Sequence, residues 1–75
     1  MNAEVIKVAA KRNLRIKDIL SKSRKRKLFY ARMEIAQRLR DKGYIIEDIA
    51  SILNRDHSTI VYYLYYAKKE VNLQC

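Results

Sequence analysis

Apolar residues recur every three or four positions along most of the chain, which is the period of helices that pack one face against a core. The pattern predicts a first helix over residues 3–12. Asn13 is expected to end it, because asparagine tolerates the left-handed conformation. A short helical turn over residues 16–20 follows, and its isoleucines and leucine are expected to cover the core as a lid.

The strongest helical stripe begins at Leu28 and continues to about Lys42. Lys42 suits the last turn, where a cation is favoured by the helix dipole, and Gly43 is expected to supply a left-handed cap. The polar residues of this helix, such as Glu34 and Arg38, fall on the opposite face. The predicted inward positions are Leu28, Arg32, Ile35, Ala36 and Leu39.

Residues 46–71 predict two further helices joined by a tight turn. The small Ala50 lies where a second helix crosses closely, Asn54 is compatible with a turn, and Ile60 points back toward the first helix. This is the layout of a helix-turn-helix. Asp56 is expected to cap the second helix, which would run from His57 to about Val71. Its predicted inward positions are Ile60, Leu64, Ala67 and Val71.

Composition agrees with a helical fold, since the 75 residues include one glycine and no proline. A chain so poor in turn-forming residues favours helices joined by short loops over strands and hairpins. Its length allows one domain at most. We therefore predict a single all-α domain over residues 1–75, with a loop over residues 21–27 before the long central helix.

Positive charge is concentrated in the middle of the chain. The formal net charge is +9, and residues 21–42 alone carry nine basic and two acidic side chains. Charge gathered in one third of a small domain indicates a site for a polyanion. The alternative is a solvated basic face that only keeps the protein soluble. The densest run is Lys22, Arg24, Lys25, Arg26 and Lys27.

Several classes of site are not expected. Cys75 is the only cysteine and His57 the only histidine, so neither an internal disulfide nor a metal site is predicted. One histidine, without paired carboxylates in an apolar setting, gives no basis for catalysis. No signal peptide and no membrane-spanning run is found, so a cytoplasmic protein without cofactors is expected.

Two motifs together resemble a known family. Arg55-Asp56-His57-Ser58-Thr59 resembles the signature Arg-Asp-His-Thr-Thr of the C-terminal DNA-binding domain of the bacterial replication initiator DnaA. Residues 21–26, Ser-Lys-Ser-Arg-Lys-Arg, resemble that domain's basic loop, and the distance between the two motifs fits. Residues 16–20 resemble the short helix before the loop. The resemblance covers roughly residues 5–71.

The resemblance implies an all-helical fold related to the Trp repressor and sequence-specific binding to double-stranded DNA, in replication-origin recognition or transcription regulation near the nucleoid. Arg24 would enter the minor groove, while Asp56, His57 and Ser58 would read the major groove. The positions expected to hold phosphates or support the loop are Arg26, Arg32, Arg55 and Thr59. Lys22, Lys27 and Tyr62 complete the set of expected DNA contacts.

This sequence also departs from the family pattern. Ser58 replaces a threonine, which removes a methyl group that could contact thymine. Tyr30-Ala31 stand where the family often has Arg-Pro, and Tyr62 stands where it has a histidine. A phosphate-binding loop of an ATPase needs two glycines, and these residues contain one, so no ATPase activity is expected.

Other readings remain open at this stage. His57 could be a structural histidine. Of the tyrosines after Val61, Tyr63 could complete the core, while Tyr65 and Tyr66 could bind a second copy or another protein. A protein-interaction module that uses this helix and the basic patch is therefore the main alternative. Base stacking on single strands and sequence-independent coating of nucleic acid are the remaining alternatives.

Overall fold

The computed structural model describes the backbone of residues 2–74 and the side chains of residues 2–66. The described residues form helices joined by short loops and contain no strand, which confirms the all-α prediction. The helices in chain order are α1 (Ala3–Arg12), α2 (Ile16–Ile19), α3 (Arg26–Asp41), α4 (Ile46–Leu53) and α5 (His57–Gln74).

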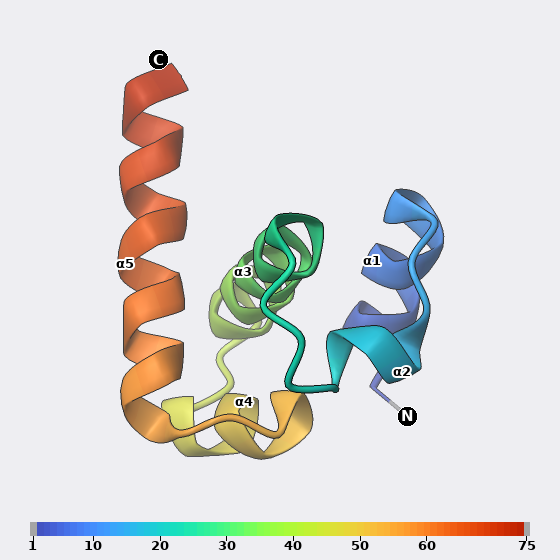
Figure 1. Ribbon diagram of the computed structural model, residues 1–75. Helices are drawn as coiled ribbons and strands as arrows, with labels where there is room; N and C mark the ends of the chain where they lie inside the picture. Colours follow the sequence, from blue (N-terminus) through green and yellow to red (C-terminus); the bar gives the residue numbers. More distant parts are fainter. Residues whose placement is uncertain (1, 75) are drawn as a thin grey trace.

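The long helix α3 lies at the centre and contacts each of the other four helices (Figure 1). Helices α1 and α2 cover one side of α3. Helices α4 and α5 meet at the other side and form the predicted helix-turn-helix. The C-terminal half of α5 extends past the other helices (Figure 1).

Two predicted boundaries were wrong. Helix α3 begins at Arg26, two residues before the predicted start, so Arg26 and Lys27 belong to its first turn and not to the loop. Their side chains are exposed, which lets the charges spread into water, and the Lys25 carbonyl already accepts from the N–H groups of Leu28 and Phe29. Helix α5 continues to Gln74, three residues beyond the predicted end.

The core confirms the predicted apolar faces. All five inward positions predicted for α3 are buried, including Arg32. Tyr63 is buried as well, whereas Leu64 is only half-buried, and Ala67 and Val71 lie outside the described side chains. The largest fully buried side chains are Ile19, Ile35, Leu39, Ile49, Leu53, Ile60, Val5 and Val8.

Three helices end in the same way, at the three residues with positive φ within the described backbone. Asn13 and Asn54 have φ of 55° and Gly43 has φ of 94°. In each case the next residue donates its N–H to the carbonyl five positions earlier, as Tyr44 does to Leu39 at 3.1 Å. This left-handed cap satisfies carbonyls that the helix leaves open. The predicted stops at Asn13 and Gly43 are confirmed.

A network of ion pairs joins α1 to α3, on the side away from α5. Glu34 lies 2.8 Å from both Lys11 and Arg12 of α1 and 3.1 Å from Arg38 of its own helix. Burial alone would raise the pKa of Glu34, but the three hydrogen-bonded cations lower it to about 2. Sequence analysis had placed Glu34 on an outward face and missed this role.

A second acid, Glu4, is buried in α1 and belongs to the same network. Its carboxylate lies 2.7 Å from Lys42 Nζ and 3.3 Å from Arg38 of α3. The hydrogen bond from Lys42 lowers the pKa of Glu4 most, and Arg38 lowers it further against the effect of burial. Both acids therefore favour the folded state when they are ionised.

We expect Glu34→Gln to reduce the amount of folding stability that the protein loses as the pH falls. The folded-state pKa of Glu34 is lowered from 4.5 to about 2, so its stabilisation is complete above pH ~4.5 and is lost as the pH falls toward 2. The ceiling of this contribution is about 3 kcal/mol, reduced by solvent because its partners are partly exposed. Urea denaturation at pH 6 and pH 2.5 measures the loss in each variant.

The parent should lose more free energy of unfolding between the two pH values than Glu34→Gln does, while Glu4 contributes a loss that both share. Glu47→Gln is the matched control, because Glu47 is exposed and forms no ion pair among the described residues. Equal pH dependence in the parent and Glu34→Gln would contradict the role assigned to this network.

Candidate nucleic-acid interface

One buried arginine of α3 holds the basic loop between α2 and α3 in place through hydrogen bonds. Arg32 is 2% exposed and its guanidinium donates four hydrogen bonds to backbone carbonyls. Nε donates to Ile19 at 2.7 Å and Nη1 to Ser23 at 2.8 Å. Nη2 donates to Asp18 at 3.2 Å and to Ser21 at 2.8 Å. Arg32 thus supports the loop, and little of its side chain is left exposed.

A second arginine connects the helix-turn-helix to the same loop. Arg55, in the turn between α4 and α5, donates from Nη2 to the carbonyl of Ser21, which also accepts from Arg32. Burial lowers the pKa of Arg32 most, and the nearby charge of Arg55 lowers it further. Because both guanidinium groups hold Ser21, the loop and the start of α5 are fixed relative to each other.

A groove of about 760 Å³ lies between the loop and the start of α5. It brings together eight of the eleven residues predicted to contact DNA. From the loop and α3 these are Lys22, Arg24, Arg26 and Arg32, and from the turn and α5 they are Arg55, Asp56, Thr59 and Tyr62. Ser23, Phe29, Asn54 and Tyr63 complete the lining.

The remaining three predicted contacts lie outside this groove. His57 and Ser58 form the first turn of α5, where both side chains are exposed and point away from the core. Lys27 lies on the other side of the loop and lines a separate, smaller cavity. Lys25, another cation of the basic run, lines the same smaller cavity.

The start of α5 is presented to solvent by the turn that precedes it. Asn54 ends α4 in the left-handed conformation, and the N–H of Arg55 donates to the Ala50 carbonyl at 2.9 Å. The N–H of Ile60 donates to the Asp56 carbonyl, which begins the hydrogen bonding of α5. The amides of the first turn thus project beyond the helix at the mouth of the groove.

The aromatic residues of α5 gather around Phe29 of α3, a residue that sequence analysis had not singled out. Phe29 contacts Tyr62, Tyr63 and Tyr66, with ring centroids 5.6–6.2 Å apart. The hydrogen bond between Tyr62 and Tyr66 raises the pKa of the Tyr62 hydroxyl. Tyr65 is 59% exposed and packs edge-on against Tyr66. The apolar Leu28-Phe29 pair was the available signal for this cluster.

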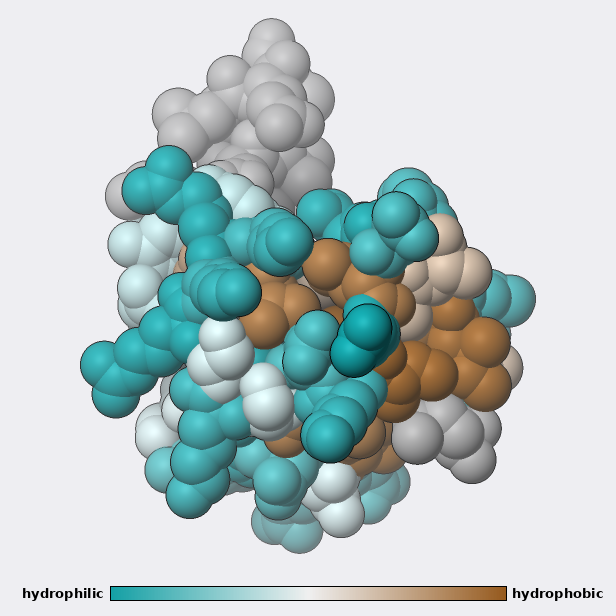
Figure 2. Space-filling model, turned by 45° about the vertical axis from the view of Figure 1, so that its right-hand side comes forward, coloured by the Kyte–Doolittle hydropathy of each residue, from teal (hydrophilic) through white to brown (hydrophobic). Residues whose placement is uncertain are grey.

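The cations of the basic run are not neutralised by neighbouring acidic side chains. Within residues 2–66, none of the five basic side chains between Lys22 and Lys27 forms an ion pair. Hydrophilic side chains also crowd much of the face that Figure 2 presents. The part of the chain that the structure describes contains no cluster of acidic, histidine and cysteine side chains fit to hold a metal ion. None of its helices combines the length and apolarity of a membrane span.

Comparison with protein families agrees with this geometry. Residues 4–65 match the family described as the bacterial DnaA protein helix-turn-helix. The matched segment includes the loop, α3, α4, the first nine residues of α5 and every residue that lines the large groove. Comparisons with curated proteins and with solved structures gave no match. The family match covers most of the chain, and the chain therefore belongs to the family of bacterial DnaA helix-turn-helix domains.

Proposed function

We propose that the protein binds a short double-stranded DNA site, with the start of α5 in the major groove and the basic loop at the minor groove. The observation that carries the proposal is the groove of about 760 Å³, in which unpaired loop cations face the turn and start of α5. Arginine and lysine bind phosphates, and arginine also suits the negative potential of a narrow minor groove.

The exposed first turn of α5 supports reading of base edges. The major groove admits an α-helix, and helix-turn-helix proteins read bases with the N-terminal residues of their second helix. His57 and Ser58 are exposed at this position and can donate or accept hydrogen bonds. Asp56 lines the groove and can accept from a cytosine amino group. Arg26, Thr59 and Tyr62 line the groove at positions suited to phosphates.

Arg24→Ala and His57→Ala should each weaken binding to the preferred duplex by about 1–3 kcal/mol and reduce discrimination between sequences. Arg24 would lose its minor-groove contact and His57 its contact to a base edge. The preferred duplex is first obtained by selection from a random pool. Titration of that duplex and of a scrambled duplex then measures affinity and preference for each variant.

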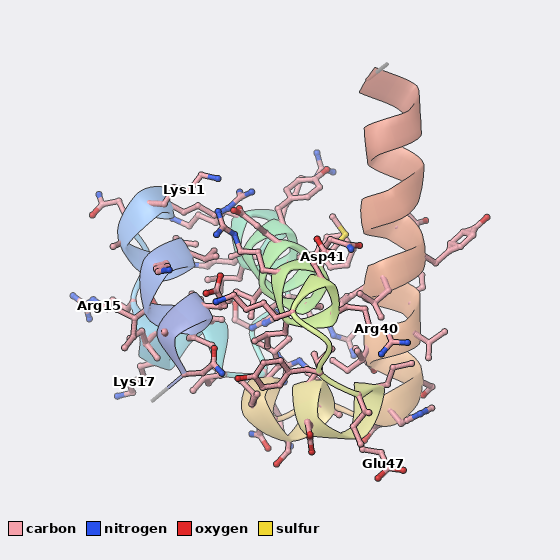
Figure 3. The ribbon with its side chains drawn as sticks, turned by 180° about the vertical axis from the view of Figure 1, so that it is seen from behind. Lys11, Arg15, Lys17, Arg40, Asp41 and Glu47 are labelled. Carbon is pink, nitrogen blue, oxygen red and sulfur yellow. The ribbon has the colours of Figure 1, made fainter. Side chains whose placement is uncertain are left out.

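Arg40→Ala is the matched control, because Arg40 is an exposed cation near the C-terminal end of α3 that lines neither the groove nor the smaller cavity (Figure 3). Among the described residues it donates only to the Tyr44 carbonyl. It should leave the sequence preference unchanged. If both Arg24→Ala and His57→Ala bind the selected duplex as the parent does, the proposed interface is wrong.

We further propose that residues 1–75 act as one DNA-binding domain without ATPase activity, near the nucleoid in the cytoplasm. Binding of this kind serves replication-origin recognition or transcription regulation. Without a nucleotide-hydrolysing part in these residues, the bound state would be set by protein and DNA concentrations alone. Measurement of DNA affinity with and without ATP and Mg²⁺ tests this, and equal affinities are expected.

The exposed tyrosines favour a second candidate function. Tyr65 is well exposed, and Tyr66 keeps an exposed part although it also contacts Phe29 of α3. Aromatic side chains are enriched at protein interfaces. We propose that this part of α5 takes part in self-association or in binding another protein. Sedimentation of the parent and of a Tyr65→Ser/Tyr66→Ser variant tests self-association. The parent is expected to sediment with a mass above that of one chain, and the variant with the mass of one chain.

A further inference from the structure

The basic loop and the first turn of α3 present their cations on two sides. Lys22, Arg24 and Arg26 line the large groove next to α5. Lys25 and Lys27 instead line a second cavity of about 230 Å³ on the side next to α1 and α2. Ser23 lines both cavities, so the loop itself forms the wall between them. Alternate cations therefore face opposite directions.

A third cation, from another part of the chain, also lines the second cavity. Arg15, at the start of α2, lines it together with Lys25 and Lys27. Asp18 lines it as well, so three cations oppose one carboxylate. Among residues 2–66, Arg15, Lys25 and Lys27 have no ion pair. Arg15 and Lys17 project outward from the end of the molecule opposite α5 (Figure 3).

The wall between the cavities is rigid enough to keep this separation. Arg32 holds the carbonyls of Ser21 and Ser23 at 2.8 Å, and the N–H of Ser23 donates to the Ser21 hydroxyl at 3.2 Å. Helix α3 begins one residue after Lys25, so the backbone at Lys27 is helical. The two sets of cations cannot exchange sides without breaking these hydrogen bonds.

We propose that Arg15, Lys25 and Lys27 bind the phosphodiester backbone of the second DNA strand across the minor groove. A minor groove is about 6 Å wide and has one sugar-phosphate strand along each edge. A loop that enters it therefore has phosphates on both sides. The groove beside α5 would take one strand and the smaller cavity the other. This inference rests on the proposed function and adds contacts to the second DNA strand.

The test measures the salt dependence of binding to the selected duplex by Lys25→Gln/Lys27→Gln. Each phosphate contact contributes about 0.9 to the slope of log affinity against log salt, so the double variant should lose about 1.8. Its sequence preference should be unchanged, because phosphate contacts carry no base information. Asp18→Asn should shift affinity in the opposite direction, because Asp18 is the one carboxylate among the described residues that line the cavity.

Lys7→Gln/Arg40→Gln is the control, because it removes the same charge from exposed positions that line neither cavity. The inference predicts that the control keeps most of the parental slope. Equal losses in the two double variants would show a general charge effect and overturn it, as would a parental slope in Lys25→Gln/Lys27→Gln. If the parent itself binds no duplex, the proposed function is refuted instead.

A methylphosphonate scan locates the contacted strand. Neutralising single phosphates on the strand across the minor groove should weaken the parent but not Lys25→Gln/Lys27→Gln. Neutralising phosphates on the other strand should weaken both proteins alike. Identical scans for the two proteins would exclude a contact from this cavity. Circular dichroism at each step verifies that the variants are folded.

Discussion

Arg32→Ala should lower the free energy of unfolding by about 2–4 kcal/mol. A hydrogen bond to a charged group contributes roughly 1.5–3 kcal/mol, and partial hydration of the released carbonyls offsets part of that loss. The substitution also empties space beside the core, since Arg32 is 2% exposed. For a domain of this size the melting temperature would fall by about 4–8 °C for each kcal/mol.

Arg32→Lys separates the role of geometry from that of charge. A lysine keeps the positive charge but presents its donors from one nitrogen, so it cannot reproduce the fork that reaches four carbonyls. It should recover only part of the stability. Arg26→Ala is the control from the same helix, because Arg26 is exposed and should change stability by less than about 0.5 kcal/mol. Urea titration followed by circular dichroism measures all three variants.

The same variants test whether loop position matters for binding. At temperatures where Arg32→Lys is fully folded, its loop has lost part of its support while Arg24 and the start of α5 remain present. Weaker DNA binding by this folded variant would show that Arg32 acts through the position of the loop. Parental stability in Arg32→Ala, by contrast, would show that the loop does not need the four hydrogen bonds.

Sequence alone predicted most of the fold because its signals are local. The three-to-four spacing of apolar residues locates α1, α3 and α4, and Asn13, Gly43 and Asn54 mark their ends. The family resemblance added the relation between loop and helix-turn-helix. The start of α3 was predicted two residues late because charge density was weighed against helix formation, although exposed cations can point away from one another into water.

The roles of individual charged residues depended on contacts between distant parts of the chain. Arg32 fits a helical stripe as an apolar position would, and only the carbonyls of residues 18–23 explain its burial. Glu4 and Glu34 pair with cations on a neighbouring helix, 22 or more positions away. The opposite directions of Lys25 and Arg26 follow from where the loop turns into helix. No local pattern contains this information.

Binding to duplex DNA should weaken by about 500-fold when monovalent salt is raised from 50 mM to 200 mM. If the five cations between Lys22 and Lys27 each neutralise one phosphate, the slope of log affinity against log salt is about −4.5. This range of salt spans about 0.6 decades, which gives about 2.7 decades of affinity. Fluorescence anisotropy of a labelled duplex at several salt concentrations measures the slope.

The slope also distinguishes the proposed functions. An aromatic interface made by Tyr65 and Tyr66 buries few charges, so its affinity would change little over the same range. Sequence-independent coating would show a steep slope too, but the same affinity for every duplex. Duplex binding with a slope shallower than about −2 would mean that most of the loop cations do not meet phosphates. A steep slope combined with a strong preference for one sequence requires both the basic loop and the start of α5. Phosphate contacts alone cannot distinguish bases, and base contacts alone release few ions.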